Sequence, residues 1–422
     1  MTVEPNDCST SINRGSLFAG AARIDITPHD LTGLTNLWER PFEGVHDRIF
    51  VRALVVDNGI NCAAIVAADL VEFGDTAQIR KRVEKEIGIP ADHIIIAASH
   101  DHSAPRVGNV TPGATAHKGG PATQQYTTVV YERILQALQQ AKAGMQRARV
   151  GVGRGAADVN TNRDEFTAEG WRLGANPAGP SDKTVWVVKF ETESHEPIAI
   201  LMNYAVHSVV LGPNNTLLTG DLAGATERYV EHYYNDRSVA LWTVGPAGDQ
   251  NPKFVSYHEH LLQSPERIPA YALMETLGQF LGEEVVRVAG QIGRMSSEVR
   301  VEAEERVASC PARIPPRHAK GSGIEVQPVD SLDIRLGVIT IGHIALTWVS
   351  GEVVTNIYWH LRRESPFSNT IMITMANDRV GYIVDDAGYD APTFESTASP
   401  FRRGYAEPAI VDGLVDIMSR YQ

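Results

Sequence analysis

Cysteine is scarce in this sequence, and that scarcity limits the kind of protein it encodes. The 422 residues include three cysteines, Cys8, Cys62 and Cys310, which lie far apart and form no CxxC pair. Such a set excludes a disulfide-stapled framework and a zinc ribbon, and it is typical of free thiols in a reducing compartment. We therefore expect a cytoplasmic protein.

Positive charge and long apolar runs are also lacking. The net charge of −13 argues against nucleic acid or an anionic membrane as the main partner, because both bind basic surfaces. No run reaches the roughly 18 apolar residues that a transmembrane helix needs, and the polar N-terminus has no secretory apolar region. The composition, 43% hydrophobic and 21% charged, predicts a soluble globular chain.

Strand-like and helix-like patterns alternate along the chain. Apolar β-branched runs predict strands at 17–27, 49–56, 62–69, 93–99, 147–153, 184–192, 197–210, 239–244, 299–307 and 370–375, and a hairpin over 331–350. Amphipathic spacing predicts helices at 75–87, 125–143, 221–234, 270–289 and 408–420, and one after Glu352. Asp75 is the expected N-cap of the first helix, with Gln78 completing a capping box. The alternation predicts an α/β fold of mixed sheets flanked by helices, with a flexible leader over 1–15 and one large domain over 16–422.

Two histidines follow the apolar run at 93–99. His100 and His102 are one residue apart and lead into a loop rich in proline and glycine. Alternation along an extended strand would place both side chains on one face. Imidazole is the commonest metal ligand, so the pair favours a hydrolytic metal site. The alternative is two hydrogen-bonded polar residues at a strand end.

Polar side chains also stand at the exits of other predicted strands. They are Asp69, His207, Asp249, Asn251, Glu352 and the segment 377–382, which includes Tyr382. Strands that deliver His, His, Glu and Tyr to one edge can assemble a zinc site that keeps a position for water. Each residue also has a plain alternative: His207 as a core histidine, Glu352 as an acid at a helix N-terminus, and Tyr382 as a packing aromatic.

Several segments in a shared order resemble the N-terminal catalytic domain of the neutral/alkaline (non-lysosomal) ceramidase family. They are GAARIDITP at 20–28, GVHDR at 44–48, the run 55–70, HDHS at 100–103, NTNR at 160–163, NYAVHS at 203–208, GD at 220–221, GDQNP at 248–252, GE at 351–352 and parts of 377–397. The resemblance runs from residue 17 to about residue 399. It implies a ceramidase-type catalytic domain in which a zinc-bound water attacks an amide carbonyl and releases a fatty acid and sphingosine.

The resemblance also implies roles for individual residues. The family's zinc ligands fall on His100, His207, Glu352 and Tyr382, which implies one zinc ion per chain. His102 falls on a position that polarises the substrate, and Arg163 on an arginine that helps to bind the scissile group. His46, Asp69 and Asp249 match family positions and are expected to support the site.

This sequence departs from the family pattern around the substrate. Asn251 replaces a serine needed for activity, and Phe394 replaces a tyrosine, so one oxyanion donor is absent. The family's HTHSGPGG becomes HDHSAPRV at 100–107, and no C-terminal immunoglobulin-like domain is expected. We therefore expect a zinc hydrolase of an amide, an ester or a lactone in a small or amphiphilic substrate, with ceramide itself not expected.

Several alternatives stay open at this point. The same site could catalyse a metal-assisted elimination on a sugar-like or small polar substrate, or the fold could serve a catalytically silent binding protein. Manganese or iron could replace zinc, because the ligand set suits all three metals. A second ion could bind His258 and His260 in the loop after Asn251. A homo-oligomer is an open alternative.

Overall fold

The computed structural model describes residues 14–108, 120–256, 270–317 and 328–422. Its largest sheet has eight strands in the order β13-β11-β10-β7-β2-β4-β5-β6. Their bounds are β2 Phe18–Asp25, β4 Phe50–Asp57, β5 Cys62–Ala68, β6 Ile94–Ala98, β7 Gln146–Ala156, β10 Thr184–Thr192, β11 Pro197–Tyr204 and β13 Val239–Val244. Strand β6 runs parallel to β5, and β13 runs parallel to β11, whereas the other neighbouring strands are antiparallel. The sheet is therefore mixed, as the sequence predicts.

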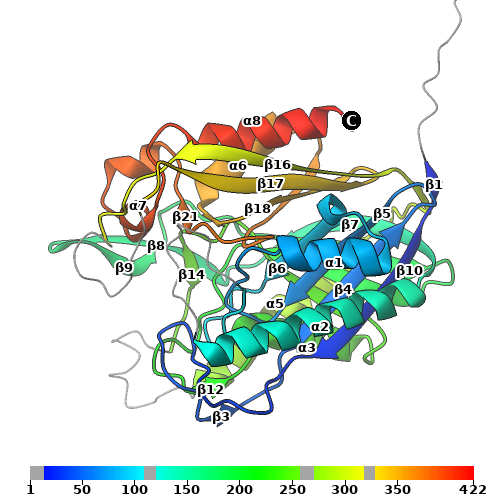
Figure 1. Ribbon diagram of the computed structural model, residues 1–422, viewed down its shortest axis with the longest axis horizontal. Coiled ribbons are helices and arrows are strands. Elements are labelled where there is room, and N and C mark those ends of the chain that lie inside the picture. The colour runs from blue at the N-terminus through cyan, green and yellow to red at the C-terminus, as the bar shows by residue number, and fades with distance from the viewer. Residues whose placement is uncertain (1–13, 109–119, 257–269, 318–327) are drawn as a thin grey trace, which may run out of the picture.

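A second sheet of four strands lies against one face of the first (Figure 1). Its order is β16-β17-β18-β20, with bounds Val301–Pro311, Ser331–Ile341, Ile344–Val349 and Asn369–Ile373. One apolar core joins the two sheets, because Trp186 and Leu201 of the first pack in the same cluster as Trp348 and Ile371 of the second. The centre of the molecule is a sandwich of two sheets.

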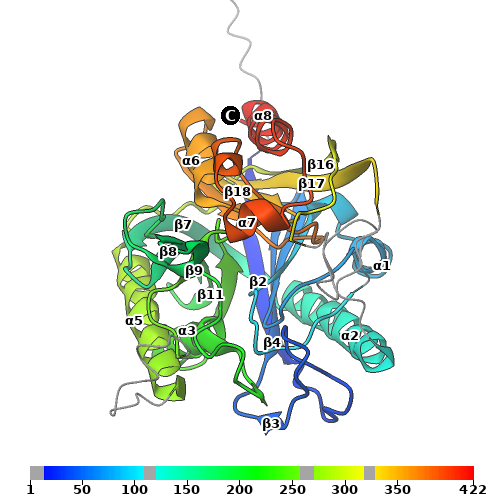
Figure 2. The same ribbon diagram turned by 90° about the vertical axis from the view of Figure 1, so that its left-hand side faces the viewer.

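Helices cover both outer faces of the sandwich, so the layers run helix, sheet, sheet, helix (Figures 1 and 2). On the larger sheet, α1 (Ala77–Ile87) and α2 (Pro121–Ala143) pack on the half that contains β4 and β5, and α3 (Asp221–Tyr233) and α5 (Ala270–Gln291) on the other half. On the smaller sheet lie α6 (Thr355–Glu364) and α8 (Ala406–Ser419). The α/β prediction is confirmed.

Short elements complete the described chain. They are β1 Gly15–Ser16, β3 Gly44–Val45, β8 Asn160–Thr167, β9 Gly170–Asn176, β12 Leu217–Leu218, β14 Gln250–Pro252, β15 Glu298–Val299, β19 Glu352–Val353, β21 Tyr382–Ile383 and α7 Phe394–Ala398. The hairpin β8–β9 was not predicted, because its strands are polar and lack apolar alternation. Strand β8 is instead fixed by pairing with β14, which comes about ninety residues later.

Two local predictions need correction. The helix α1 begins at Ala77, so its N-cap is Thr76 rather than Asp75, and the Thr76 side chain makes no capping hydrogen bond. The Asp75 side chain instead accepts from the Ala77 N–H at 2.8 Å, and the Thr76 hydroxyl donates to the Asn377 carbonyl at 2.8 Å. The strand predicted over 197–210 ends at Tyr204, which leaves His207 in the following irregular segment. The α1 C-terminus is as expected, with Gly88 in the left-handed region at φ 76°.

Some predictions fall outside the described residues. Residues 1–13, with Cys8 and most of the predicted leader, are among them, as are His258 and His260. Cys62 and Cys310 are free thiols. Across the described ranges, none of the helices combines the length and the apolar character that crossing a membrane requires. The cytoplasmic location, the domain boundaries and the oligomeric state stay predictions.

Candidate metal centre

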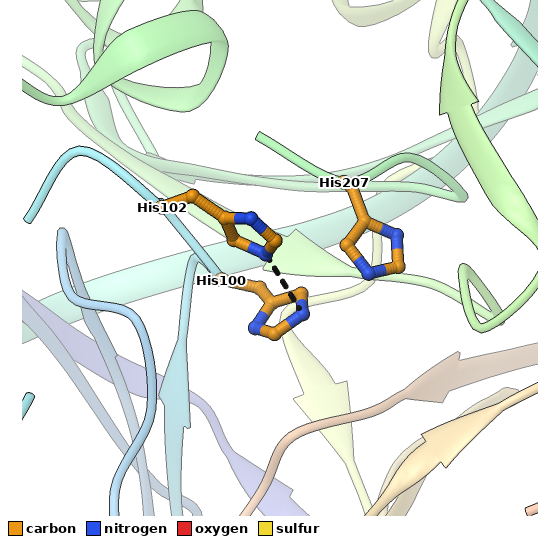
Figure 3. Close-up of side chains that lie close together, drawn as sticks. All are labelled: His100, His102 and His207. Atoms are coloured by element: carbon orange, nitrogen blue, oxygen red, sulfur yellow. Dashed lines mark hydrogen bonds between the residues drawn. The ribbon is translucent and has the colours of Figure 1, made fainter. Parts of the chain in front are cut away.

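Three buried histidines meet where two strands of the large sheet end. His100 and His102 follow β6, and His207 follows β11. Their exposed fractions are 3%, 8% and 0%, and one ring nitrogen from each lies within 4.8 Å of the others. Figure 3 shows the three rings converging on one point. The structure therefore brings together three of the predicted site residues.

The two neighbouring histidines converge for a reason other than strand alternation. The strand β6 ends at Ala98, and His100 adopts a left-handed backbone with φ 56°. The His102 N–H then donates to the Ser208 carbonyl at 3.1 Å, which joins this loop to the one that carries His207. The predicted extended His-x-His geometry was wrong, although the two rings do meet.

Backbone carbonyls orient two of the rings. Nδ1 of His100 lies 2.9 Å from the Val71 oxygen, and Nδ1 of His207 lies 2.9 Å from the Gln250 oxygen. A carbonyl accepts only from a protonated nitrogen, so in each neutral ring the lone pair is on Nε2. Both Nε2 atoms lie 3.3 Å from the same Glu352 oxygen, Oε2.

The two Nε2 atoms and the Glu352 oxygen together form a suitable binding position for a cation. Two imidazole lone pairs and a carboxylate oxygen face one another, and they repel one another unless a positive charge lies between them. Burial, with the nearby positive charge of Arg163, lowers the pKa of His207 to about 4, so its ring is neutral and able to ligate. Imidazole nitrogen and carboxylate oxygen are among the usual ligands of zinc.

Tyr382 stands beside Glu352 on the neighbouring strand. The strands β19 and β21 run parallel, with Glu352 and Tyr382 as register partners. The Tyr382 hydroxyl accepts a hydrogen bond of 3.0 Å from Arg163 Nη2. Burial raises the pKa of this phenol, so a nearby cation would be needed to make it a phenolate ligand.

Arg163 reaches the centre from β8 and is held on three sides. Its Nε donates to Glu395 Oε1 at 2.7 Å, and its Nη1 donates to Asn251 Oδ1 at 3.2 Å. The third bond is the one from Nη2 to Tyr382. Pairing of β8 with β14, in which Thr161 faces Asn251, places the arginine and the asparagine side by side. The guanidinium lies 3.4 Å from His207 Nε2, measured from Nη1, so it borders the proposed cation position.

Glu395 is a site residue that the sequence reasoning missed. It is 1% exposed and forms the closest ion pair of Arg163. A signal was present, because Glu395 lies in the segment 377–397 that resembles the family, but the sequence assigned it no role. Its place is set by the packing of α7 near β9 and β21.

Two further predicted residues, Asp249 and Phe394, contact Arg163 and Tyr382 of the centre. Asp249 accepts from the backbone N–H of Thr355 at 3.0 Å and from its hydroxyl at 2.8 Å, and burial raises the Asp249 pKa to about 6. Its carbonyl also accepts from the Arg163 N–H at 3.0 Å. Phe394 presents its ring edge-on to Tyr382, with 5.6 Å between ring centroids, where it offers no hydroxyl.

The structure places the other two predicted residues elsewhere. Asp69 accepts from Arg52 Nη1 at 3.0 Å inside a separate buried network that includes Glu227 and Glu231. His46 stacks on Tyr271, with 3.9 Å between ring centroids. Val71, two residues after Asp69, holds His100 through its carbonyl, and the Leu70 carbonyl accepts from the Asp101 N–H at 3.1 Å.

Comparison with known proteins adds the following findings. The family model described as "Neutral/alkaline non-lysosomal ceramidase, N-terminal" matches residues 18–260. The neutral ceramidase of Drosophila melanogaster is 25% identical over 237 residues, which cover 52% of this chain and 33% of that protein. The neutral ceramidase of Oryza sativa subsp. japonica is 23% identical over 248 residues, which cover 54% of this chain and 30% of that protein. The chain thus spans about a third of the length of the curated relatives that it matches.

A solved structure extends the likeness to nearly the whole fold. The neutral ceramidase from Pseudomonas aeruginosa superposes with a TM-score of 0.77 at 16% identity, covering 96% of this chain and 74% of that one. A structure described as ceramidase complexed with C2 gives a TM-score of 0.77 at 18% identity, covering 96% of this chain and 75% of that one. At this identity the likeness establishes the fold.

Proposed function

This chain belongs to the neutral/alkaline non-lysosomal ceramidase family, and from that premise we propose that it is a zinc-dependent hydrolase of an amide, an ester or a lactone. The observation that supports the proposal is the meeting of His100 Nε2, His207 Nε2 and Glu352 Oε2 at one buried point. Bound zinc supplies two effects there: it lowers the pKa of a water molecule to about 7, and it polarises a carbonyl.

The proposed ligand set is His100, His207 and Glu352, with Tyr382 as the fourth, for one zinc ion per chain. Glu352 uses Oε2 toward the two histidines, while its Oε1 accepts from Arg379 Nη2 at 3.3 Å. This second contact fixes the carboxylate plane, and ligand orientation of this kind typically affects metal affinity about 10- to 100-fold.

His102 and Arg163 are the side chains that we assign to the substrate. Hydrolysis adds water to the carbonyl carbon, breaks the bond to nitrogen or oxygen, and transfers a proton to the leaving atom. Burial and the neighbouring His100 lower the pKa of His102 well below its usual range, so the ring is neutral and we assign it to hydrogen bonding with the substrate. The guanidinium of Arg163, held in place by Glu395, is suited to bind the oxygen that gains negative charge.

We propose a small or amphiphilic substrate other than ceramide. Asn251 carries an amide in place of the family serine, and its Oδ1 is already bonded to Arg163. Phe394 offers a ring where the family has a hydroxyl. Both changes alter side chains that we expect to face the substrate, and we call these two residues, Asn251 and Phe394, the substrate wall. The proposed zinc ligands are unchanged. Elimination from a sugar-like substrate is the second candidate, favoured by the same two changes, and analysis of the product distinguishes it from hydrolysis.

The first test is metal content by elemental analysis on the purified protein. We expect about one zinc per chain in the wild type and loss of the metal in His100→Ala. His93→Ala is the matched control, because His93 lies just before the same strand, where its Nδ1 is 3.0 Å from the Cys62 oxygen. Retention of zinc by His100→Ala would overturn the site. With zinc established, failure to hydrolyse a panel of amides, esters and lactones would overturn the reaction and favour the binding protein.

A further inference from the structure

The loop between β2 and β3, blue in Figure 1, carries Trp38, which contacts the candidate centre. The indole of Trp38 meets the ring of His102 edge-on, with 5.4 Å between ring centroids and 69° between planes. Trp38 is half-buried, whereas the three histidines are buried. The indole therefore extends from the buried histidine cluster toward solvent.

Several hydrogen bonds hold this loop rigid. The Asn36 side chain accepts from the Trp38 N–H at 2.9 Å and from the Arg40 N–H at 3.1 Å. The Leu37 N–H donates to the His102 carbonyl at 3.3 Å, which ties the loop to the centre itself. The Leu37 carbonyl in turn accepts from Arg106 Nη2 at 2.7 Å.

The backbone at the tryptophan is also unusual. Glu39, the next residue, has φ 61°, a left-handed conformation that non-glycine residues adopt rarely. Such conformations persist only where the surrounding structure determines them, and they concentrate at functional sites. A rigid aromatic beside a reactive centre binds a ligand with little loss of side-chain entropy.

We propose that Trp38 is a specificity-determining residue that packs against the apolar group attached to the scissile carbonyl. The inference rests on the proposed function. A carbonyl bound between Arg163 and His102 must direct its substituent away from the buried ligands, and we assign that substituent to Trp38, the half-buried aromatic that contacts His102. The substrate class is therefore an acyl compound with an aromatic or branched apolar acyl group, rather than an acetyl or a sugar-derived group.

The test compares acyl groups on a constant leaving group. The ratio of kcat/KM for p-nitrophenyl benzoate to that for p-nitrophenyl acetate is measured in the zinc-loaded wild type, Trp38→Phe and Trp38→Ala. We expect Trp38→Ala to lower the ratio about two- to ten-fold, the usual range for one aromatic contact, and Trp38→Phe to restore most of it. The change should arise in KM, since the indole touches no reacting atom.

A second readout is independent of turnover. Binding of benzoate and of acetate to the same zinc-loaded proteins is measured by calorimetry, with zinc content confirmed for each. Trp171→Ala is the matched control, because Trp171 lies on the exposed hairpin β8–β9 beside Phe166. We expect this variant to keep the wild-type preference for benzoate.

The outcomes separate this inference from the proposed function. An unchanged benzoate-to-acetate ratio in Trp38→Ala, or an equal change in Trp171→Ala, would overturn the role of Trp38 while leaving the hydrolase intact. Trp38-dependent binding of benzoate in a protein that hydrolyses no ester would overturn the hydrolase and support the aromatic contact. A Trp38 effect confined to sugar-derived lactones would overturn the acyl assignment.

Discussion

The ion pair between Glu395 and Arg163 is the contact whose removal tests the site most directly. The two side chains are 1% and 4% exposed, and 2.7 Å separates Arg163 Nε from Glu395 Oε1. In Glu395→Ala the guanidinium stays buried and loses its closest counter-charge, while its bonds to Asn251 and Tyr382 remain. We expect this variant to be destabilised and to bind substrate poorly.

The magnitude follows from burial. Removing one partner of a buried ion pair costs about 3–5 kcal/mol, because an uncompensated charge remains in a region of low dielectric constant. The two remaining hydrogen bonds of Arg163 place the expected loss for Glu395→Ala near the lower limit, about 3 kcal/mol. Glu395→Gln keeps an acceptor for Nε–H and should lose about 1–2 kcal/mol.

The assay is urea unfolding together with zinc content and kcat/KM. The matched control is Glu165→Ala, because Glu165 lies on β8 like Arg163. Its ion pair with Arg172 is 3.0 Å long, but the two side chains are 32% and 61% exposed. The loss in free energy of unfolding should therefore stay below about 1 kcal/mol. Zinc content should be unchanged in both, because neither acid contacts the histidines. The double variant Glu395→Ala/Arg163→Met should recover part of the stability.

The reasoning would be refuted by equal losses in Glu395→Ala and Glu165→Ala. It would also be refuted if Glu395→Ala kept the wild-type kcat/KM. The first result would show that Arg163 is well solvated, and the second that its position does not matter to the substrate.

Three further predictions concern residues around β14. A Cβ at Gly248 would lie 2.8 Å from the Glu352 carbonyl oxygen, so Gly248→Ala should displace β19 and weaken zinc retention under dialysis against a chelator; wild-type retention would contradict this. The Asp249 pKa rises from 3.8 to about 6 on folding, so this carboxyl favours the folded state at low pH and destabilises it as pH rises through that window. Relative to wild type, Asp249→Asn should therefore gain about 2 kcal/mol in the free energy of unfolding in urea between pH 4.5 and pH 7.5, and a pH-independent difference would disprove it. Asn251→Ser restores the family residue and should raise amidase activity; no gain in kcat/KM would mean that the wall is built for another substrate.

The fold was largely predictable because its signals are local. The apolar runs at 49–56 and 62–69 and the amphipathic pattern at 75–87 each specify a nearby structure, and they are present as β4, β5 and α1. The hairpin β8–β9 was missed because its pairing partner, Gln250–Pro252, is distant in sequence. Apolar periodicity says nothing about a polar strand that is stabilised by a remote neighbour.

The candidate site was predictable only in part. The residue types His100, His207 and Glu352 were recognised at strand exits, and the structure brings them together. Their geometry could not be predicted, because it depends on the left-handed turn at His100 and on the loop contact with Ser208. Glu395 was missed for a different reason, since its role comes from tertiary packing, although it lies in a segment that resembles the family.

Backbone carbonyls, not side chains, orient His100 and His207. Residues that face the substrate can therefore change while the candidate metal centre is kept. The groups that orient His100 and His207 are the backbone carbonyls of Val71 and Gln250, and any residue supplies a carbonyl. Substitution nearby therefore leaves the orientation of the rings intact as long as the loops keep their path. The proposed substrate contacts, by contrast, are side chains such as Asn251, and replacing a side chain changes its hydrogen-bond donors and acceptors directly. A chain with this architecture can acquire a new substrate without rebuilding the metal centre, and that is the pattern expected if Asn251 and Phe394 arose under selection for a compound other than ceramide.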